Sequence, residues 1–352
     1  MSEFEDMIAD TTRRIFQDLG RPQDIILAGD ESWRTPLWAA LEDAGLTRAW
    51  AGEEFGGAGL GAAATFTILR VAGEYGVAVP LAETILATHL LAEAGILAPE
   101  GSLAVAPAAS GDGLTIDSAG QVSGRSDAVP FANGVDHLVC LAEGEAGPTV
   151  ALITIGDCGI DSRTAHSSDS RDGVVLNGVA ALEHAPSTID ADGLRRLGAA
   201  MRAAQMAGAM QGLLDISVDY AQERIAFGRP IGKFQAVQHL LARLAEETAA
   251  ALAAAGSVAH ALDTLPLDSE AVFVEVAAAK IRAGEAAGEA ALIAHQTHGA
   301  IGFTLEHPLH RLVQRMWDWR DDFGGEAEWS LPLGRLFAGK GSGGFWPAIT
   351  AI

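Results

Sequence analysis

The sequence is poor in cysteine and in positive charge. Its 2 cysteines, Cys140 and Cys158, are too few for a disulfide framework or a zinc site, so a reducing, cytoplasmic location is expected. Lysine and arginine number 23 against 46 aspartate and glutamate residues, which gives a formal net charge of −23. This negative charge argues against nucleic acid or an anionic membrane as the main partner, although a local basic pocket for an anionic ligand stays compatible with it.

Long hydrophobic runs are also missing. No stretch of about 18 residues has the apolar character of a membrane span, so no membrane insertion is expected. The first residues, "MSEFEDMIAD", lack the basic-then-apolar order of a signal peptide. With 49% hydrophobic and 20% charged residues, the composition is that of a soluble globular protein. The length of 352 residues predicts two or three subdomains.

The hydrophobic period changes twice along the chain. Residues 1–100 have helical spacing, as in "TPLWAALEDAGL", and the predicted helices end at glycine. Residues 101–187 contain short β-branched runs such as "PTVALITIG", which predict a shortened antiparallel β domain of four to six strands. Residues 188–352 return to longer helical segments, typical of a four-helix bundle. The predicted fold class is therefore α+β, in the order helical, β, helical.

One stretch, "YAQERIAFGRPIGKFQAVQ", places a turn between two helix-like runs and surrounds it with a cation, an aromatic ring and amides. Together with "HQTHGAIGFTLEHPLHRLVQR" and the turn in "LEDAGLTRAWAGEEFGGAGLG", it resembles the acyl-CoA dehydrogenase family. The resemblance covers most of the chain and is strongest in its C-terminal half. It implies an N-terminal helical domain, a middle β domain, a C-terminal bundle, FAD as cofactor, an acyl-CoA substrate and electron transfer flavoprotein as electron acceptor.

The resemblance also implies which residues reach FAD, a cofactor held at the boundary between subunits in this family. Arg224 would contact the pyrophosphate, because a planar guanidinium matches phosphate oxygens. Phe227 would pack on the cofactor, and Gln235 would bond to its nucleotide part. Gln296 and Gly299 match the family's second nucleotide contact, although Ala300 stands where the family usually has another glycine.

The catalytic base of the family, a glutamate, is not found where the resemblance places it. It would remove a proton next to the thioester, at one of two positions in the chain. Here these positions hold Gly324, which follows Phe323, and a residue at about Gly198. Glu326 and Glu328 are near the first position, but a shift of two or four residues along a helix changes their direction. They are weak catalytic candidates, and we interpret them first as a solvated acidic pair.

The middle domain lacks a second part of the family's site. Its segment "APAASGDGLTIDSAGQVSGRSDAVPFANGVDHLV" contains neither the Thr-Glu-x-x-x-Gly-Ser-Asp loop nor the aromatic-Ile-Thr/Ser strand that hold the flavin ring. The chain therefore resembles the short subunit of the α2β2 dehydrogenases of steroid side-chain degradation, whose partner subunit would supply that loop and the base. Two alternatives stay open: a self-sufficient enzyme with a relocated base, and a non-catalytic acyl-CoA-binding or structural relative.

Other residue groups have simpler interpretations. A metal site is not expected from His295, His298, His307 and His310, although His307 and His310 are spaced to share a helix face. The tryptophans at 317, 319 and 329 are interpreted as core. The CoA-contacting residues stay open: Arg195, Arg196 and Arg202 could reach its phosphates, but are interpreted as surface cations. The glycines of "GEEFGGAGLG" do not follow a strand, so no phosphate-binding loop is expected there.

Overall fold

A computed structural model describes residues 3–107 and 113–350. The chain forms two compact units, and the boundary between them falls within the long helix α6 (Ala191–Glu223). One unit contains residues 38–61 and 78–198, and the other contains residues 3–37, 62–77 and 199–350. The three sequence domains, 1–100, 101–187 and 188–352, stay a prediction.

The first unit is built around a sheet of eight strands. They are β1 (Leu103–Val105), β2 (Thr115–Ile116), β3 (Gln121–Pro130), β4 (His137–Gly144), β5 (Gly147–Thr154), β6 (Gly159–Asp161), β7 (Arg171–Ala180) and β8 (Glu183–Pro186). The order is β6-β7-β3-β2-β4-β5-β8, with β1 beside β4. Most pairings are antiparallel, but β1 and β2 run parallel to β4. The predicted count of four to six strands is too low, because strands of two or three residues carry no period of their own.

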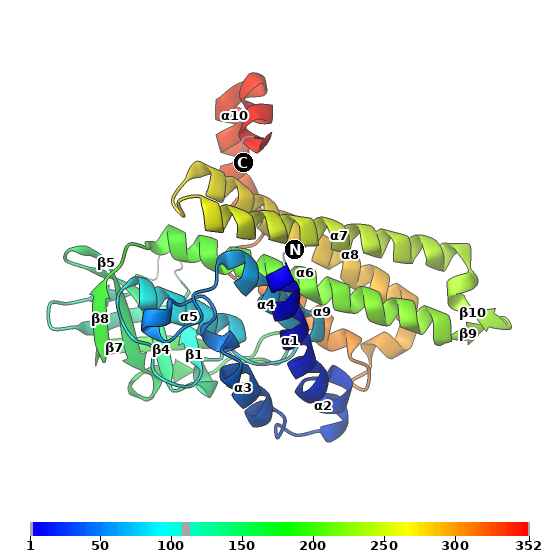
Figure 1. Cartoon of the computed structure of the whole chain (residues 1–352), viewed down its shortest axis with the longest axis horizontal. Helices are drawn as coiled ribbons and strands as arrows, with labels where there is room; N and C mark the ends of the chain where they lie inside the picture. Colours follow the sequence, from blue (N-terminus) through cyan, green and yellow to red (C-terminus); the bar gives the residue numbers. More distant parts are fainter. Residues whose placement is uncertain (1–2, 108–112, 351–352) are drawn as a thin grey trace. The chain divides into compact units, whose positions relative to one another are not determined.

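One face of the sheet packs into a hydrophobic core. Val122, Leu138, Ile153, Val174 and Leu176 are among its fully or almost fully buried side chains. Leu138, Cys140 and Ala142 of β4, like Val174 and Leu176 of β7, recur at every second position, since alternate residues of a strand point to the same face. Helix α5 (Leu81–Glu93) belongs to this unit and packs beside β1 (Figure 1). Helix α3 (Arg34–Asp43) ends before Gly45, as the sequence predicts.

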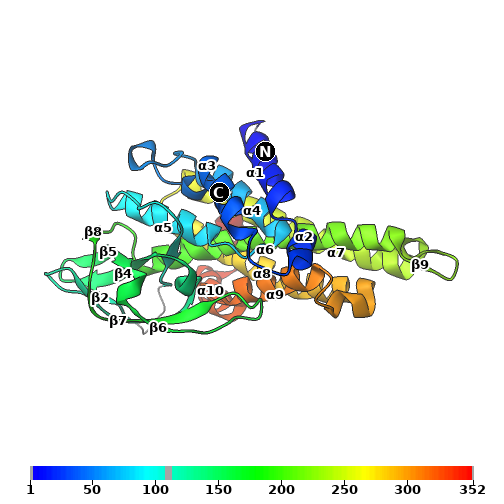
Figure 2. The ribbon, with the colours of Figure 1, turned by 90° about the horizontal axis from the view of Figure 1, so that it is seen from below.

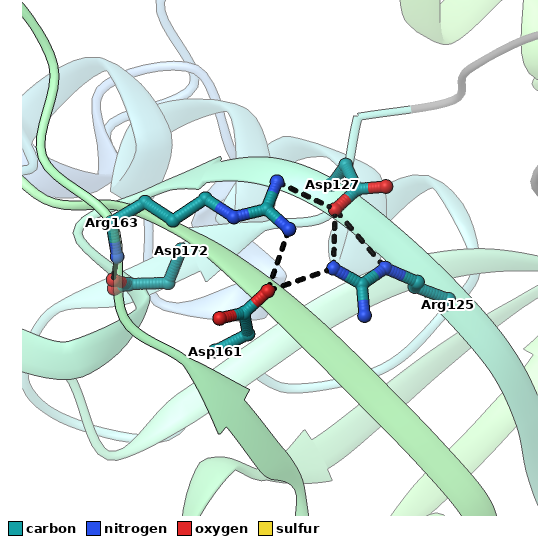
Figure 3. A network of polar contacts seen from close by, with 5 residues as sticks. All are labelled: Arg125, Asp127, Asp161, Arg163 and Asp172. Carbon is teal, nitrogen blue, oxygen red and sulfur yellow. Dashed lines mark hydrogen bonds and ion pairs between the residues drawn. The ribbon is translucent and has the colours of Figure 1, made fainter.

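A ring of ion pairs joins β3 to β6 within the same unit. Arg125 contacts Asp127 at 2.8 Å and Asp161 at 3.0 Å, and Arg163 contacts the same two carboxylates at 3.0 and 2.6 Å (Figure 3). These hydrogen bonds from Arg125 lower the pKa of Asp127 and of Asp161. Below the ring, the buried Asp172 carboxylate accepts the backbone N–H groups of Asn133 and Arg163. Two arginines balance two aspartates in the ring itself.

The segment of the missing flavin-ring loop lies in this sheet. It runs from the end of β1 through β2 and β3 into β4. Its residues 108–112 lie outside the described part of the chain. The remaining residues form β2, β3 and the start of β4, and they supply Arg125 and Asp127 to the ion-pair ring. The described part of this segment is therefore structural.

The second unit is helical. It contains α1 (Glu3–Leu19), α2 (Pro22–Ala28), α4 (Ala62–Tyr75), most of α6, α7 (Gln235–Thr264), α8 (Glu270–His298), α9 (Leu309–Asp321) and α10 (Glu326–Thr350). The long helices α6, α7 and α8 lie alongside one another, and α9 and α10 pack against α8 (Figures 1 and 2). The predicted C-terminal helical bundle is confirmed. None of the helices in the described residues is long and apolar enough to cross a membrane.

Helices α4 and α6 approach each other at backbone distance. A Cβ atom added to Gly208 would collide with the carbonyl oxygen of Arg70, and one added to Gly73 with that of Gln205. Gly212 has the same relation to the carbonyl of Glu74. Three glycines therefore hold α6 tightly against α4, which fixes the helix that leads to the functional site.

Candidate functional site

The turn at residues 227 and 228 is a tight β-hairpin between α6 and α7. Strands β9 (Ile225–Ala226) and β10 (Arg229–Pro230) pair so that Ala226 faces Arg229. Phe227 and Gly228 form the two-residue turn with φ values of +51° and +77°. Positive φ at both central positions defines a type I′ turn, which suits glycine but is uncommon for a bulky residue. Such a conformation costs on the order of 1–3 kcal/mol and is typical of functional sites.

The hairpin exposes the side chains that the sequence assigns to the cofactor. Phe227 is 95% exposed, and Arg224 and Gln235 are exposed on either side of it. The backbone of Arg224 is fixed, because its carbonyl accepts the N–H of Ile231 at 2.8 Å. Its guanidinium has no ion-pair partner within residues 3–107 and 113–350. A free cation and an uncovered ring are therefore presented on a rigid turn.

The second predicted contact lies at the end of α8. Gln296 is exposed in its last turn, and Gly299 follows with φ +65° and ψ −142°. No atom would lie within 4 Å of a Cβ added to Gly299, so its surroundings are open. One turn of α6 before Arg224, the ring of Tyr220 stacks on His298 with centroids 4.5 Å apart. This stack connects the end of α6 with the end of α8, and thus the two predicted contact regions.

These residues fit a flavin nucleotide that approaches from outside the chain. Arg224 offers a charge for a pyrophosphate, Phe227 an apolar surface, and Gln235 and Gln296 amide groups for a nucleotide. Segment 224–233 contains three cations and no acid, in a chain with a net charge of −23. The corner therefore carries a local excess of positive charge, which bulk composition alone does not reveal.

The two expected positions of the catalytic base carry no side chain in the structure either. Gly198 is buried within α6. Gly324 has φ +98° and lies in the turn between α9 and α10, directly after Phe323 with φ +55°. The indole Nε1 of Trp329 donates to the carbonyl of Phe323 at 3.1 Å and holds this turn in place. Glycine cannot abstract a proton, so neither position can perform the family's first chemical step.

Charged side chains from α6 and α8 fix this turn from below. Arg202 is 3% exposed and donates to Asp322 at 2.8 Å, so its interpretation as a surface cation is wrong. The buried Lys280 donates to the carbonyls of Trp319 and Arg320 at 2.9 and 2.6 Å. It thereby satisfies acceptors at the end of α9, where helical carbonyls have no partner within the helix. Its burial lowers the pKa of Lys280 to about 8.

The two C-terminal glutamates differ in environment. Glu326 pairs with Arg320, and its side chain is only 22% exposed, so it is not a solvated residue. Its carboxylate lies against Gly284 of α8, where any Cβ would collide with it. Glu328 is exposed and accepts the N–H of Gly325 at 3.3 Å, which agrees with the solvated interpretation. Both carboxylates thus take part in local contacts of the turn.

The histidines form ring contacts at the end of α8. His295 stacks on Phe303 at 4.1 Å, and His298 contacts the edge of His307 at 4.8 Å. His307 precedes α9 and accepts the N–H of Leu309, so the prediction that it shares a helix face with His310 is wrong. Burial lowers the pKa of His307 to about 4. Within residues 3–107 and 113–350, no group of three or more potential ligands is placed to hold a metal ion.

The three tryptophans divide between core and surface. Trp329 is 2% exposed and Trp319 is 8% exposed, which confirms the prediction that they pack in the core. Trp317 is 39% exposed, so the same prediction is wrong for this residue. A helix of this unit can carry one tryptophan outward and one inward because residues two apart lie on different faces.

A cavity of about 470 Å³ lies elsewhere in the helical unit. Helices α4 and α7 supply most of its walls, with Phe66, Leu252 and several alanines as apolar lining and Arg70 and His260 as polar groups. None of Arg224, Phe227, Gln235, Gln296 and Gly299 lines it. The candidate cofactor residues therefore form an outward-facing surface, separate from this cavity.

Comparison with known proteins shows the family of this chain. Residues 196–317 match the family model "Acyl-CoA dehydrogenase, C-terminal domain". Acyl-CoA dehydrogenase FadE27 of Mycobacterium tuberculosis is 30% identical over 86% of this chain and 91% of its own length. Acyl-CoA dehydrogenase IpdE2 of Mycolicibacterium smegmatis is 30% identical over 90% of this chain and 93% of its own length.

Solved structures share the fold along almost the whole chain. The Tcur3481-Tcur3483 steroid ACAD, solved as a G363A variant, has a chain with TM-score 0.84 and 27% identity, covering 95% of this chain and 97% of that one. The ChsE4-ChsE5 complex from Mycobacterium tuberculosis has a chain with TM-score 0.84 and 24% identity, and the match covers 95% of this chain and 97% of that one. The predicted α+β fold is confirmed. The chain belongs to the acyl-CoA dehydrogenase family, whose members are FAD-binding oxidoreductases that act on acyl-CoA.

Proposed function

We propose that this chain is the cofactor-contacting but base-free subunit of a heteromeric acyl-CoA dehydrogenase. Gly324 carries the proposal: the position of the family's base has no side chain, and its turn is fixed by the contacts of Arg202, Lys280 and Trp329. A second acyl-CoA dehydrogenase-like subunit supplies the base and the flavin-ring loop. This chain supplies Arg224, Phe227, Gln235, Gln296 and Gly299.

Exposed apolar side chains near these residues support a partner subunit. Ile225 is 57% exposed beside the hairpin tip. Leu292, Phe303 and Leu305 are 65%, 67% and 76% exposed near the end of α8. Large apolar side chains exposed together are typical of interaction sites. They lie within a few residues of the predicted FAD contacts in the sequence, so a subunit bound here would also enclose the cofactor.

The assembled enzyme introduces a 2,3 double bond into an acyl-CoA thioester. The substrate's acyl group is bulky, of the steroid side-chain type, and the similarity to a structure described as a steroid ACAD supports this. Electron transfer flavoprotein accepts the electrons. The location is cytoplasmic, where the two free cysteines stay reduced.

The test is the flavin content of the purified chain, alone and co-expressed with a second dehydrogenase-like subunit. Visible absorption and mass analysis are expected to show FAD only in the assembly, at about one FAD per pair of subunits. Arg224→Gln should lower the FAD content of the assembly. Arg243→Gln, which removes an exposed arginine paired with Glu289 on the bundle, is the matched control. FAD in every subunit of the chain alone would support the self-sufficient enzyme, and no FAD in either preparation would support the non-catalytic relative.

A further inference from the structure

Behind the hairpin tip, the ring of Phe234 contacts both the exposed ring of Phe227 and the guanidinium of Arg229. Phe227 and Phe234 meet edge to face, with centroids 6.1 Å apart and an interplanar angle of 81°. The guanidinium of Arg229 lies over the ring of Phe234, 4.3 Å from its centroid. Edge-to-face rings and a cation over a ring face are both favourable geometries, because the ring face is negative and its edge positive. Arg229, Phe234 and Phe227 thus form one continuous stack.

This stack connects both ends of the corner. Arg229 lies in β10 and pairs with Ala226, next to the tip. Phe234 precedes Gln235, the first residue of α7, so its position also fixes where that helix begins. The side chain of Gln238 donates to the carbonyl of Gly232 at 2.9 Å, and this bond ties the first turn of α7 to the segment that precedes it. The predicted cofactor contacts Phe227 and Gln235 are therefore held by a shared contact.

The geometry points to Arg229 as a positioning residue. Arg229 holds the ring of Phe234, and Phe234 in turn orients Phe227 and fixes the beginning of α7 at Gln235. Both predicted contacts are thereby directed toward the flavin nucleotide. The identity of the ligand rests on the proposed function, whereas the stack is a property of this chain alone. A ring that is 95% exposed at positive φ has few contacts of its own, so its direction depends on the neighbours that the stack provides.

The charge of Arg229 and its position can be separated by experiment. Lys233 lies four residues further on, in the same acid-free segment, and makes no ring contact in the described chain. Arg229→Met and Lys233→Met each remove one positive charge from the corner, but only the first removes the cation from the ring of Phe234. Arg229→Lys keeps a cation there and is the conservative variant.

Amide hydrogen exchange on the full chain alone tests the stack. We expect several-fold faster exchange across residues 225–235 in Arg229→Met, near-normal exchange in Arg229→Lys, and no change in Lys233→Met. Equal exchange in Arg229→Met and the unmodified chain would overturn the proposal. This result does not depend on whether FAD binds.

FAD titration of the assembly with its partner subunit tests the positioning. The Kd for FAD is expected to rise about two- to five-fold more in Arg229→Met than in Lys233→Met, which corresponds to one exposed cation–ring contact. Arg229→Lys should recover part of the loss. Equal effects of the two methionine variants would reduce the role of Arg229 to its charge and overturn the positioning role. An assembly without FAD would contradict the proposed function and the flavin-positioning role, while the stack itself is decided by hydrogen exchange.

Discussion

The ring of Tyr220 stacks on the imidazole of His298 at a centroid distance of 4.5 Å and an angle of 25°. Tyr220 lies one turn before Arg224, and His298 lies between Gln296 and Gly299. His298 is 4% exposed, its Nδ1 bonds to the carbonyl oxygen of Ala294 at 2.9 Å, and burial lowers its pKa. A neutral, buried imidazole therefore joins the two segments that carry the predicted FAD contacts.

Replacing Tyr220 should separate these two segments. Tyr220→Leu removes the ring stack and is expected to lower the free energy of unfolding by about 0.5–1.5 kcal/mol, the usual size of an aromatic pair. FAD affinity of the assembly should fall as well, because the ends of α6 and α8 are no longer fixed to each other. Chemical denaturation and FAD titration measure the two effects. Tyr220→Phe keeps the ring and serves as the control; unchanged affinity in Tyr220→Leu would show that the two segments act independently.

Glu326→Gln distinguishes a structural carboxylate from a relocated base. The carboxylate pairs with Arg320 and lies against Gly284. Replacing it with the glutamine amide should lower the free energy of unfolding by about 0–1 kcal/mol, as for other partly exposed ion pairs. Turnover of the assembly should stay within about two-fold of the unmodified enzyme. Glu328→Gln is the matched control, since Glu328 is exposed in the same turn of α10. A loss of turnover by several powers of ten in Glu326→Gln alone would identify it as the base.

The sequence predicts the fold and the outward-facing residues better than the interior of the turn at Gly324. Helical period, glycine stops and β-branched runs reflect local physics, and the order of the elements followed from them. Parallel pairing of β1 and β2 with β4 did not, because strand direction depends on contacts distant in sequence. Arg229 and Phe234 stand in the quoted stretch, but their contact appears only when the hairpin closes.

The burial of charged side chains is the feature that the sequence predicts least well. Arginine is usually a surface residue, and the burial of Arg202 depends on its bonds to Asp322, 120 positions away, and to Gln205. Lys280 likewise depends on carbonyls about 40 residues further on. No periodicity in sequence reports such pairs. The spacing of histidines failed for the related reason that His307 precedes α9 and does not share its helical geometry.

The glycine contact between α4 and α6 should tolerate no added methyl group. Gly208→Ala places a Cβ against the carbonyl oxygen of Arg70, and neither backbone can yield without moving a helix. We expect a loss of about 1–3 kcal/mol in the free energy of unfolding, the usual cost of overpacking. Gly256→Ala is the control, because a Cβ there meets no atom within 4 Å and alanine favours helices. Equal stability of the two variants in chemical denaturation would contradict the close approach.

Lys280 should make stability rise with pH in the alkaline range. Burial lowers its pKa from 10.5 to about 8, against the opposing attraction of Asp322 and Glu326. Below pH 8 both the folded and the unfolded chain carry the proton, so the full cost of burying the charge is present. Between pH 8 and pH 10.5 the unfolded chain binds more protons than the folded one, and the free energy of unfolding increases. The gain over this window is on the order of 3 kcal/mol.

Lys280→Met isolates this titration from that of other groups. Methionine fills a similar volume without a charge but leaves the carbonyls of Trp319 and Arg320 without their donor. That loss is independent of pH, whereas the cost of the buried charge is not. The stability of the unmodified chain minus that of Lys280→Met should therefore increase from pH 7.5 to pH 10, as measured by urea denaturation at each pH. A difference that stays constant would mean that Lys280 keeps its proton throughout, because its bonds to the two carbonyls and the nearby carboxylates outweigh the cost of burial.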